Sequence, residues 1–123
     1  MKPNGQALAY LGDAVIELLV RKHLLDLGIF QSKKLHEQAV IFTSALGQAK
    51  SYLAIKDLLT DEEMAYFKHG RNANLTRKAR NQSLQTYQQA TGLEALFGQL
   101  YLNGSQERIY ELFNKITTSI ETT

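Results

Sequence analysis

Residues 6–27, QALAYLGDAVIELLVRKHLLDL, decide the fold class of this 123-residue chain. On a helical wheel of about 100° per residue, their apolar side chains cover nearly the whole circumference, which is typical of a buried helix. One acid, Asp13, nevertheless lies within this helix, and Glu17 follows one turn later. A buried carboxylate is costly unless a cation or several hydrogen-bond donors compensate it, so Asp13 is a candidate functional residue.

Helical periodicity continues outside this segment, and no stretch alternates as a strand would. We expect further helices at residues 33–56, 61–69, 84–102 and 106–120. The sequence allows a break near Gly47 in the helix over residues 33–56, and another near Thr91-Gly92 in the helix over residues 84–102. It therefore predicts an all-α helical bundle, with residues 1–123 forming a single domain.

Capping residues mark the ends of these helices. Gly28 and the Asn103-Gly104 pair are expected to terminate helices, because glycine readily takes the left-handed conformation that follows a last turn. Ser32 is the expected cap of the helix over residues 33–56. Thr60 with Glu63 forms a capping box that starts the helix over residues 61–69.

The positive charge is concentrated in one part of the chain. Residues 64–93 contain no acid and five of the 14 Lys and Arg residues, whereas the chain as a whole has a net charge of only +2. A basic segment of this kind favours a polyanion partner, although a solvated loop remains the plain alternative. The chain has no cysteine, which excludes disulfides and thiolate metal sites. We expect a cytoplasmic protein, since we find neither a signal-peptide pattern nor an apolar run long enough for a membrane span.

A second embedded acid, Glu94, occurs in residues 93–102, LEALFGQLYL. Each acid has a glycine nearby, Gly12 beside Asp13 and Gly98 one turn after Glu94. Glycine inside a helix costs up to about 1 kcal/mol relative to alanine, which is reasonable where two helix backbones approach closely. We therefore expect these two helices to cross near their acids and to bring Asp13 and Glu94 together.

Two carboxylates in a partly dry site repel each other, so that either one takes up a proton or a divalent cation binds between them. A site made of oxygen ligands alone selects a hard ion such as Mg²⁺, for which Mn²⁺ is the expected substitute. The competing interpretation is structural, with each acid paired to an arginine or capping a helix. Glu17 is open to two interpretations, as a further ligand or as the i+4 partner of Arg21, and the second is slightly favoured.

Residues 8–15, LAYLGDAV, and residues 93–102 resemble the two signature motifs of the ribonuclease III family. The resemblance is closer to Mini-ribonuclease III, the form without a double-stranded RNA-binding domain. It extends to Gly70-Arg71-Asn72-Ala73 and to Tyr87 ahead of residues 90–96, ATGLEAL. Three positions that carry acids in the wider family hold neutral residues here, namely Gln6, Ala9 and Thr91. This departure leaves the number of metal ions open.

The resemblance implies a metal-dependent endoribonuclease that cleaves double-stranded RNA and leaves 5′-phosphate and 3′-hydroxyl ends. It makes Asp13 and Glu94 the catalytic metal ligands. It also implies maturation of the 23S ribosomal RNA precursor, assisted by a ribosomal protein. The chain would act as a homodimer with Tyr10 and Leu11 at the interface, because one site cuts one strand.

Phosphate and sugar contacts are assigned to the basic segment, since double-stranded RNA is recognised mainly through its shape and backbone. The expected RNA-binding residues are Lys68, Arg71, Asn72, Arg77, Lys78 and Arg80. Two alternatives remain at this stage. One is a non-catalytic ribonuclease III-like domain that binds structured RNA as a scaffold, which the missing acids favour. The other is a helical DNA-binding or protein-interaction module.

Overall fold

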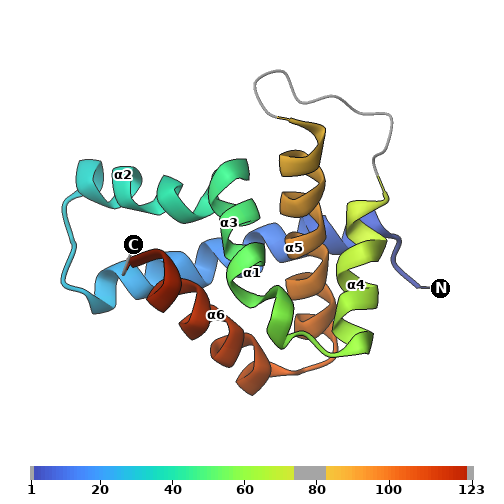
Figure 1. The fold of residues 1–123 in the computed structure, drawn as a ribbon. Coiled ribbons are helices and arrows are strands. Elements are labelled where there is room, and N and C mark those ends of the chain that lie inside the picture. Colours follow the sequence, from blue (N-terminus) through green and yellow to red (C-terminus); the bar gives the residue numbers. More distant parts are fainter. Residues whose placement is uncertain (1, 74–82, 122–123) are drawn as a thin grey trace.

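The computed structural model describes residues 2–73 and 83–121 (Figure 1). This part of the chain contains helices and no strand, which confirms the prediction of an all-α bundle. The elements are α1 (Gly5–Asp26), α2 (Ser32–Thr43), α3 (Ala45–Ile55), a short 3-10 helix η1 (Lys56–Leu58), α4 (Asp61–Arg71), α5 (Leu84–Leu102) and α6 (Gln106–Glu121).

Local capping explains where α1 and α5 end. The Asn4 side chain accepts a hydrogen bond from the Ala7 amide at 2.8 Å and so caps the start of α1. Gly28 follows the end of α1 with a φ of 82°, and Gly104 follows the end of α5 with a φ of 73°. Both values lie in the left-handed region that glycine adopts at low cost. The two predicted stops are therefore confirmed.

The predicted helix over residues 33–56 is two helices, and the break lies at Ser44 rather than Gly47. Ser44 is extended, with a ψ of 161°, and its hydroxyl accepts the amide of Gly47 at 3.0 Å. This bond caps a new helix and turns the chain. Ser32 does not cap α2: it lies inside the helix, and Gln31 at the cap position makes no side-chain bond.

The predicted break near Thr91-Gly92 was also wrong, because α5 is continuous through it. Thr91 keeps its hydroxyl within the helix by donating to the Tyr87 carbonyl at 3.0 Å. Gly92 serves packing against α4 instead, since a Cβ at this position would lie 2.5 Å from the Phe67 ring. The capping box of α4 is confirmed, with Glu63 and Thr60 bonded to each other's backbone amides.

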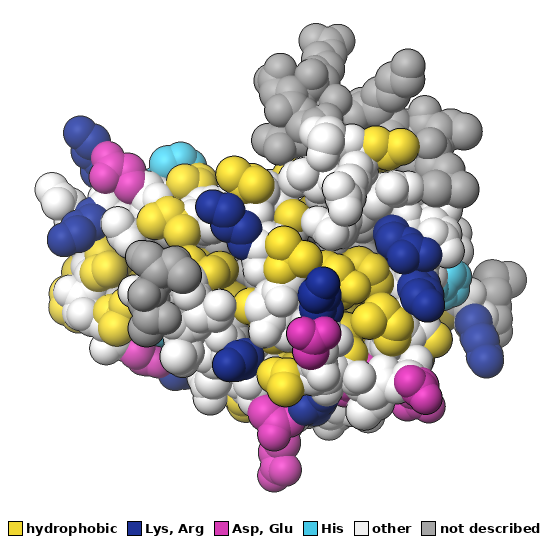
Figure 2. All heavy atoms as spheres, viewed as in Figure 1, with side chains coloured by type: hydrophobic (Ala, Val, Ile, Leu, Met, Phe, Trp, Pro, Cys, Tyr) yellow, Lys and Arg dark blue, Asp and Glu magenta, His cyan; other side chains and the backbone are white. Residues whose placement is uncertain are grey.

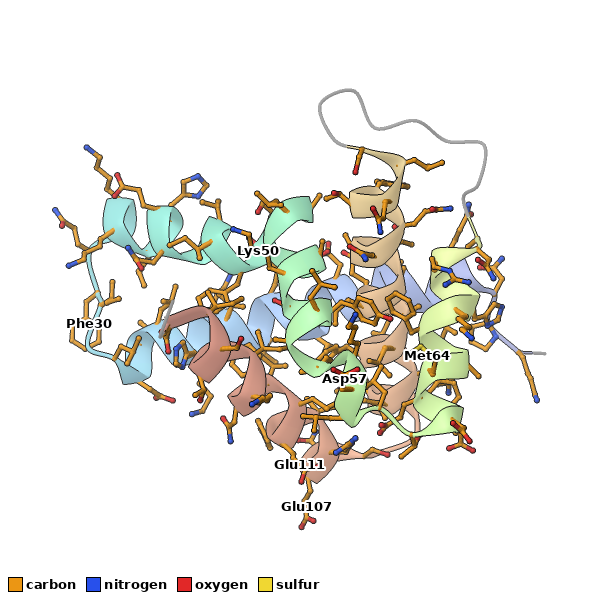
Figure 3. All side chains as sticks on the ribbon, in the orientation of Figure 1. Phe30, Lys50, Asp57, Met64, Glu107 and Glu111 are labelled. Atoms are coloured by element: carbon orange, nitrogen blue, oxygen red, sulfur yellow. The ribbon has the colours of Figure 1, made fainter. Side chains whose placement is uncertain are left out.

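Helix α5 stands at the centre of the fold, against α1, α3 and α4, and α1 crosses behind it (Figure 1). Its inner face packs into the main core of apolar side chains, which fill the space between the helices (Figure 3). Leu8, Ala9 and Ala95 form a smaller second cluster where α1 meets α5. The largest fully buried side chains of the main core are Phe67, Phe97, Leu24, Ile55, Leu93, Leu96 and Leu112. No helix of the described residues has the length and apolar character needed to span a membrane.

Helix α1 is not buried all round, which corrects the expectation from its sequence. Its core face carries Leu8, Val20 and Leu24, but the opposite face leaves Tyr10 86% and Leu18 69% exposed. Asp13 lies on the exposed side as well. The apolar pattern therefore includes side chains such as Tyr10 and Leu18 that the described part of the chain leaves exposed, and Asp13 is open to solvent.

Candidate active site

Helices α1 and α5 touch through two glycines. A Cβ atom at Gly12 would lie 1.6 Å from the carbonyl oxygen of Glu94, and one at Gly98 would lie 2.1 Å from that of Leu8. No side chain fits between backbones this close, so both positions require glycine. The predicted crossing of the two helices near their acids is confirmed.

The crossing brings both acids to one cleft with a volume of about 280 Å³. Helix α1 contributes one wall and the N-terminal half of α5 contributes the other. The lining residues are Gln6, Ala9, Tyr10, Asp13, Tyr87, Thr91 and Glu94. Asp13 lies at the exposed edge, whereas Glu94 is partly buried.

The two carboxyl groups interact electrostatically. Burial, followed by the negative charge of Asp13 and a hydrogen bond with it, raises the pKa of Glu94 to about 8. A hydrogen bond from Gln48 acts in the opposite direction and lowers this pKa. In the absence of a cation, the pair therefore retains a proton near neutral pH, as expected for two acids that cannot both ionise freely.

The donor set fits a hard cation that retains much of its own hydration. Among residues 2–73 and 83–121, no group of three or more His, Cys, Asp or Glu side chains could hold a metal ion. Three neutral residues, Gln6, Ala9 and Thr91, line the cleft where the wider family's pattern would place acids. A site of two carboxylates suits Mg²⁺, which takes its remaining ligands from water and substrate phosphate.

Glu17 belongs to a different part of the surface. Its carboxylate pairs with Arg21 at 3.3 Å, as an exposed i+4 ion pair. It lines a separate groove between α1 and α2, together with His36 and Val40 among others. The structure thus supports the interpretation of Glu17 as the partner of Arg21.

The expected RNA-binding residues divide into three groups. Arg77, Lys78 and Arg80 lie outside the described residues. Lys68 and Asn72 are exposed at the C-terminal end of α4. Figure 2 shows Lys and Arg side chains spread across the visible face, without one concentrated patch. Arg71, also near the end of α4, lies partly buried in a recess with Tyr52 and three glutamines of α5.

The end of α4 is connected to the cleft through the start of α1. Asn72 and His69 line a recess of about 420 Å³ together with Asn4, Gly5 and Gln6. Gln6 also lines the cleft of the two acids. Asn72 is therefore close to the carboxylate cleft, whereas the Arg71 recess borders a different set of α5 residues.

Comparison with known proteins identifies the family. Residues 6–105 match the model of the Ribonuclease III domain. A Mini-ribonuclease 3 from Enterococcus faecalis is 42% identical over 90% of this chain and 86% of that protein. Another from Staphylococcus aureus is 40% identical over 95% of this chain and 89% of that protein. The chain belongs to the Mini-ribonuclease III branch of the ribonuclease III family.

A solved structure shares the all-helical fold of this chain. A crystal structure of a protein from Fusobacterium nucleatum aligns with a TM-score of 0.85 and 31% identity, covering 94% of this chain and 93% of that one. As a member of the Mini-ribonuclease III branch, the chain is an endoribonuclease of double-stranded RNA, and ribonuclease III nucleases are metal-dependent. Membership favours this activity over the non-catalytic scaffold and over a DNA-binding or protein-interaction module.

Sequence reasoning missed one polar residue at this candidate site. Gln48, in the first turn of α3, is only 3% exposed, and its Nε2 atom donates to Oε2 of Glu94 at 3.4 Å. The available signal was the pair Gly47-Gln48, because a glycine followed by a polar residue in an apolar helix repeats the Gly12-Asp13 pattern.

Proposed function

We propose that Asp13 and Glu94 bind Mg²⁺, or Mn²⁺ in its place, against the scissile phosphate of double-stranded RNA. The observation that carries this proposal is the contact of α1 and α5 at Gly12 and Gly98, which places both acids in one cleft. The raised pKa of Glu94 supports it, because burial and, after it, the charge of Asp13 disfavour the free carboxylate, and a bound cation would offset both.

The two acids have different tasks in this mechanism. When bound, the ion supplies Lewis acidity to the phosphate and makes a coordinated water more acidic. Glu94 is partly buried on the central helix, so it fixes one ligand position rigidly. Asp13 lies at the open edge of the cleft, where an RNA backbone can reach it. The neutral residues Gln6 and Thr91 leave the rest of the cleft to water and phosphate oxygens.

We assign the RNA backbone contacts to the end of α4 and the segment that follows it. Lys68 and Asn72 are exposed at the end of α4, and Asn72 shares a recess with Gln6 at the start of α1, a residue that also lines the cleft. Arg77, Lys78 and Arg80 continue the positive charge along the sequence towards α5. Arg71 has its own recess, so its contact with RNA is the less direct one.

Cutting both strands of a duplex requires two active sites, so we propose a homodimer with Tyr10 and Leu11 at its interface. The support is the pair of apolar side chains of α1, Tyr10 and Leu18, that the described residues leave exposed, with Leu11 half-buried beside them. An exposed apolar face of this kind commonly marks a protein interface.

The natural substrate that we propose is the 23S ribosomal RNA precursor in the cytoplasm, with a ribosomal protein assisting. This part rests on the resemblance to Mini-ribonuclease III alone. Comparing cleavage of a precursor fragment and of an unrelated duplex, with and without ribosomal proteins, would test it.

The metal site is tested with Asp13→Asn and Glu94→Gln, assayed for Mg²⁺-dependent cleavage of duplex RNA. Both should bind RNA but lose cleavage, because each removes one of two charged ligands. Glu17→Gln is the matched control and should cut as the wild type does. Cleavage by Asp13→Asn at the wild-type rate would refute the assignment, and wild-type protein that binds duplex RNA without cutting it would favour the scaffold alternative. Matched RNA and DNA duplexes at fixed salt test the preference for RNA.

A further inference from the structure

Gln48 is a buried polar residue that donates a hydrogen bond to one of the two acids of the cleft. Its side chain comes from α3, a third helix, and reaches the Glu94 carboxylate on α5 with a 3.4 Å hydrogen bond. Burying an amide costs free energy unless it is hydrogen-bonded, so the contact accounts for a polar residue at this position.

The backbone around Gln48 is held firmly. A Cβ atom at Gly47 would lie 2.2 Å from the Ile41 carbonyl oxygen, so α3 begins in direct contact with the end of α2. The Gly47 amide donates to the Ser44 hydroxyl at 3.0 Å, and the Gly47 carbonyl accepts from the Ser51 hydroxyl at 2.8 Å. These contacts fix the first turn of α3 and therefore the direction from which Gln48 approaches Glu94.

We propose that Gln48 is a positioning residue of the active site, which holds the Glu94 carboxylate in its metal-binding orientation beside Asp13. This inference rests on the proposed function, because it assumes that Glu94 is a ligand. Groups that bond to ligating carboxylates commonly orient them and tune metal binding in this way.

The neutrality of the amide matters to this role. An arginine or lysine at position 48 would also donate to Glu94, but its positive charge would neutralise the carboxylate and compete with the cation. A glutamine donates without changing the net charge of the Asp13 and Glu94 pair. The amide therefore orients the ligand while leaving its charge available to the metal.

The test is Gln48→Met, which has nearly the same shape as glutamine and no donor. Mn²⁺ affinity of the RNA-free protein, measured by calorimetry, should fall by roughly 10–100-fold, as for other partners of metal ligands. The Mg²⁺ concentration needed for half-maximal cleavage should rise. Affinity for duplex RNA without metal should not change, since Gln48 is buried.

The matched control is Thr117→Val in α6, which removes a different buried donor, a hydroxyl that bonds to the Asn114 carbonyl within its own helix. It should leave Mn²⁺ affinity unchanged. Gln48→Asn is a second variant that keeps the amide but shortens its reach by one methylene. It should weaken Mn²⁺ binding as well, and it serves as the test if Gln48→Met does not fold.

The outcomes separate the two proposals. Wild-type Mn²⁺ affinity and Mg²⁺ requirement in the Gln48 variants would overturn the positioning role alone. An equal loss of Mn²⁺ affinity in Thr117→Val would also overturn it, because the effect would then reflect general destabilisation. If Asp13→Asn and Glu94→Gln instead bind Mn²⁺ with the affinity of the wild type, the proposed metal site is overturned.

Discussion

Replacing Gly12 with alanine should separate α1 from α5 and disrupt both stability and catalysis. The added Cβ would lie 1.6 Å from the Glu94 carbonyl oxygen, which is 1.8 Å short of the 3.4 Å at which ordinary contact begins. Its neighbours are backbone atoms of Glu94 and Gly98, so no flexible side chain can move aside. Overpacking of this kind costs about 3 kcal/mol or more, and the better helix propensity of alanine returns only about 1 kcal/mol.

The net loss is about 2 kcal/mol, which lowers the melting temperature by roughly 8 °C for a domain of this size. The assay is thermal unfolding of the metal-free protein followed by circular dichroism. The Mg²⁺ concentration required for cleavage should rise too, because Mg²⁺ demands near-ideal ligand distances of about 2.0–2.1 Å.

The sign of the effect distinguishes the crossing from simple helix propensity. At an exposed helix position alanine is the more stable residue, so Ala65→Gly in α4 should destabilise the protein by about 1 kcal/mol. At position 12 the protein with glycine should be more stable than the protein with alanine. A Gly12→Ala protein that melts at or above the wild-type temperature, with an unchanged Mg²⁺ requirement, would refute the claim that the glycine contact positions the site.

Three further predictions concern charge and assembly. The pKa of Glu94 is raised from 4.5 to about 8, so between these pH values the metal-free folded state binds more protons than the unfolded state. The free energy of unfolding should therefore fall as pH rises from 4.5 to 8. Urea titrations should show a smaller fall in Glu94→Gln. Arg108→Met leaves the buried Glu63 carboxylate without its ion pair at 2.8 Å and should cost about 3 kcal/mol by urea unfolding at pH 7. Arg108 lowers the pKa of Glu63, so the stability that this pair supplies should disappear as pH falls below about 4.5, and the pH dependence should weaken in the variant. Leu18→Asp, on the exposed side of α1 and outside the cleft, should yield a monomer by sedimentation, with single-strand nicking replacing duplex cleavage, whereas Tyr110→Asp on α6 should remain dimeric.

Local sequence signals predicted most of the elements and the approach of the two acids. The Thr60 and Glu63 capping box works over four residues, and Gly28 and Gly104 need only their own backbone angles, so these positions could be read without the fold. The pairing of an acid with a glycine on each of two helices carried tertiary information, because helix-interior glycine has a cost that close packing explains.

The errors arose where tertiary contacts decide. Gly92 looked like a helix break in the sequence, but its missing side chain makes room for the Phe67 ring. Helix α2 ends at Ser44 because Ser44 caps α3, and the residues around Ser44 do not show in the sequence that the chain breaks there. The contact of Gln48 with Glu94 could not be predicted from the sequence, because it depends on how the first turn of α3 packs against α5. The position of Asp13 on the open side of α1 followed from packing that the apolar periodicity of α1 did not reveal.

The limited number of acids makes metal binding and RNA binding interdependent. In the proposed site, Asp13 and Glu94 would supply only two carboxylates to an ion that prefers six oxygen ligands, and the other residues that line the cleft are neutral. Water, and phosphate oxygens when RNA is bound, would supply the other ligands. By thermodynamic linkage, RNA then raises the affinity for the ion by the same factor as the ion raises the affinity for RNA at that position. Full assembly of the site thus depends on the duplex, which confines the hydrolytic chemistry to RNA that is already in place.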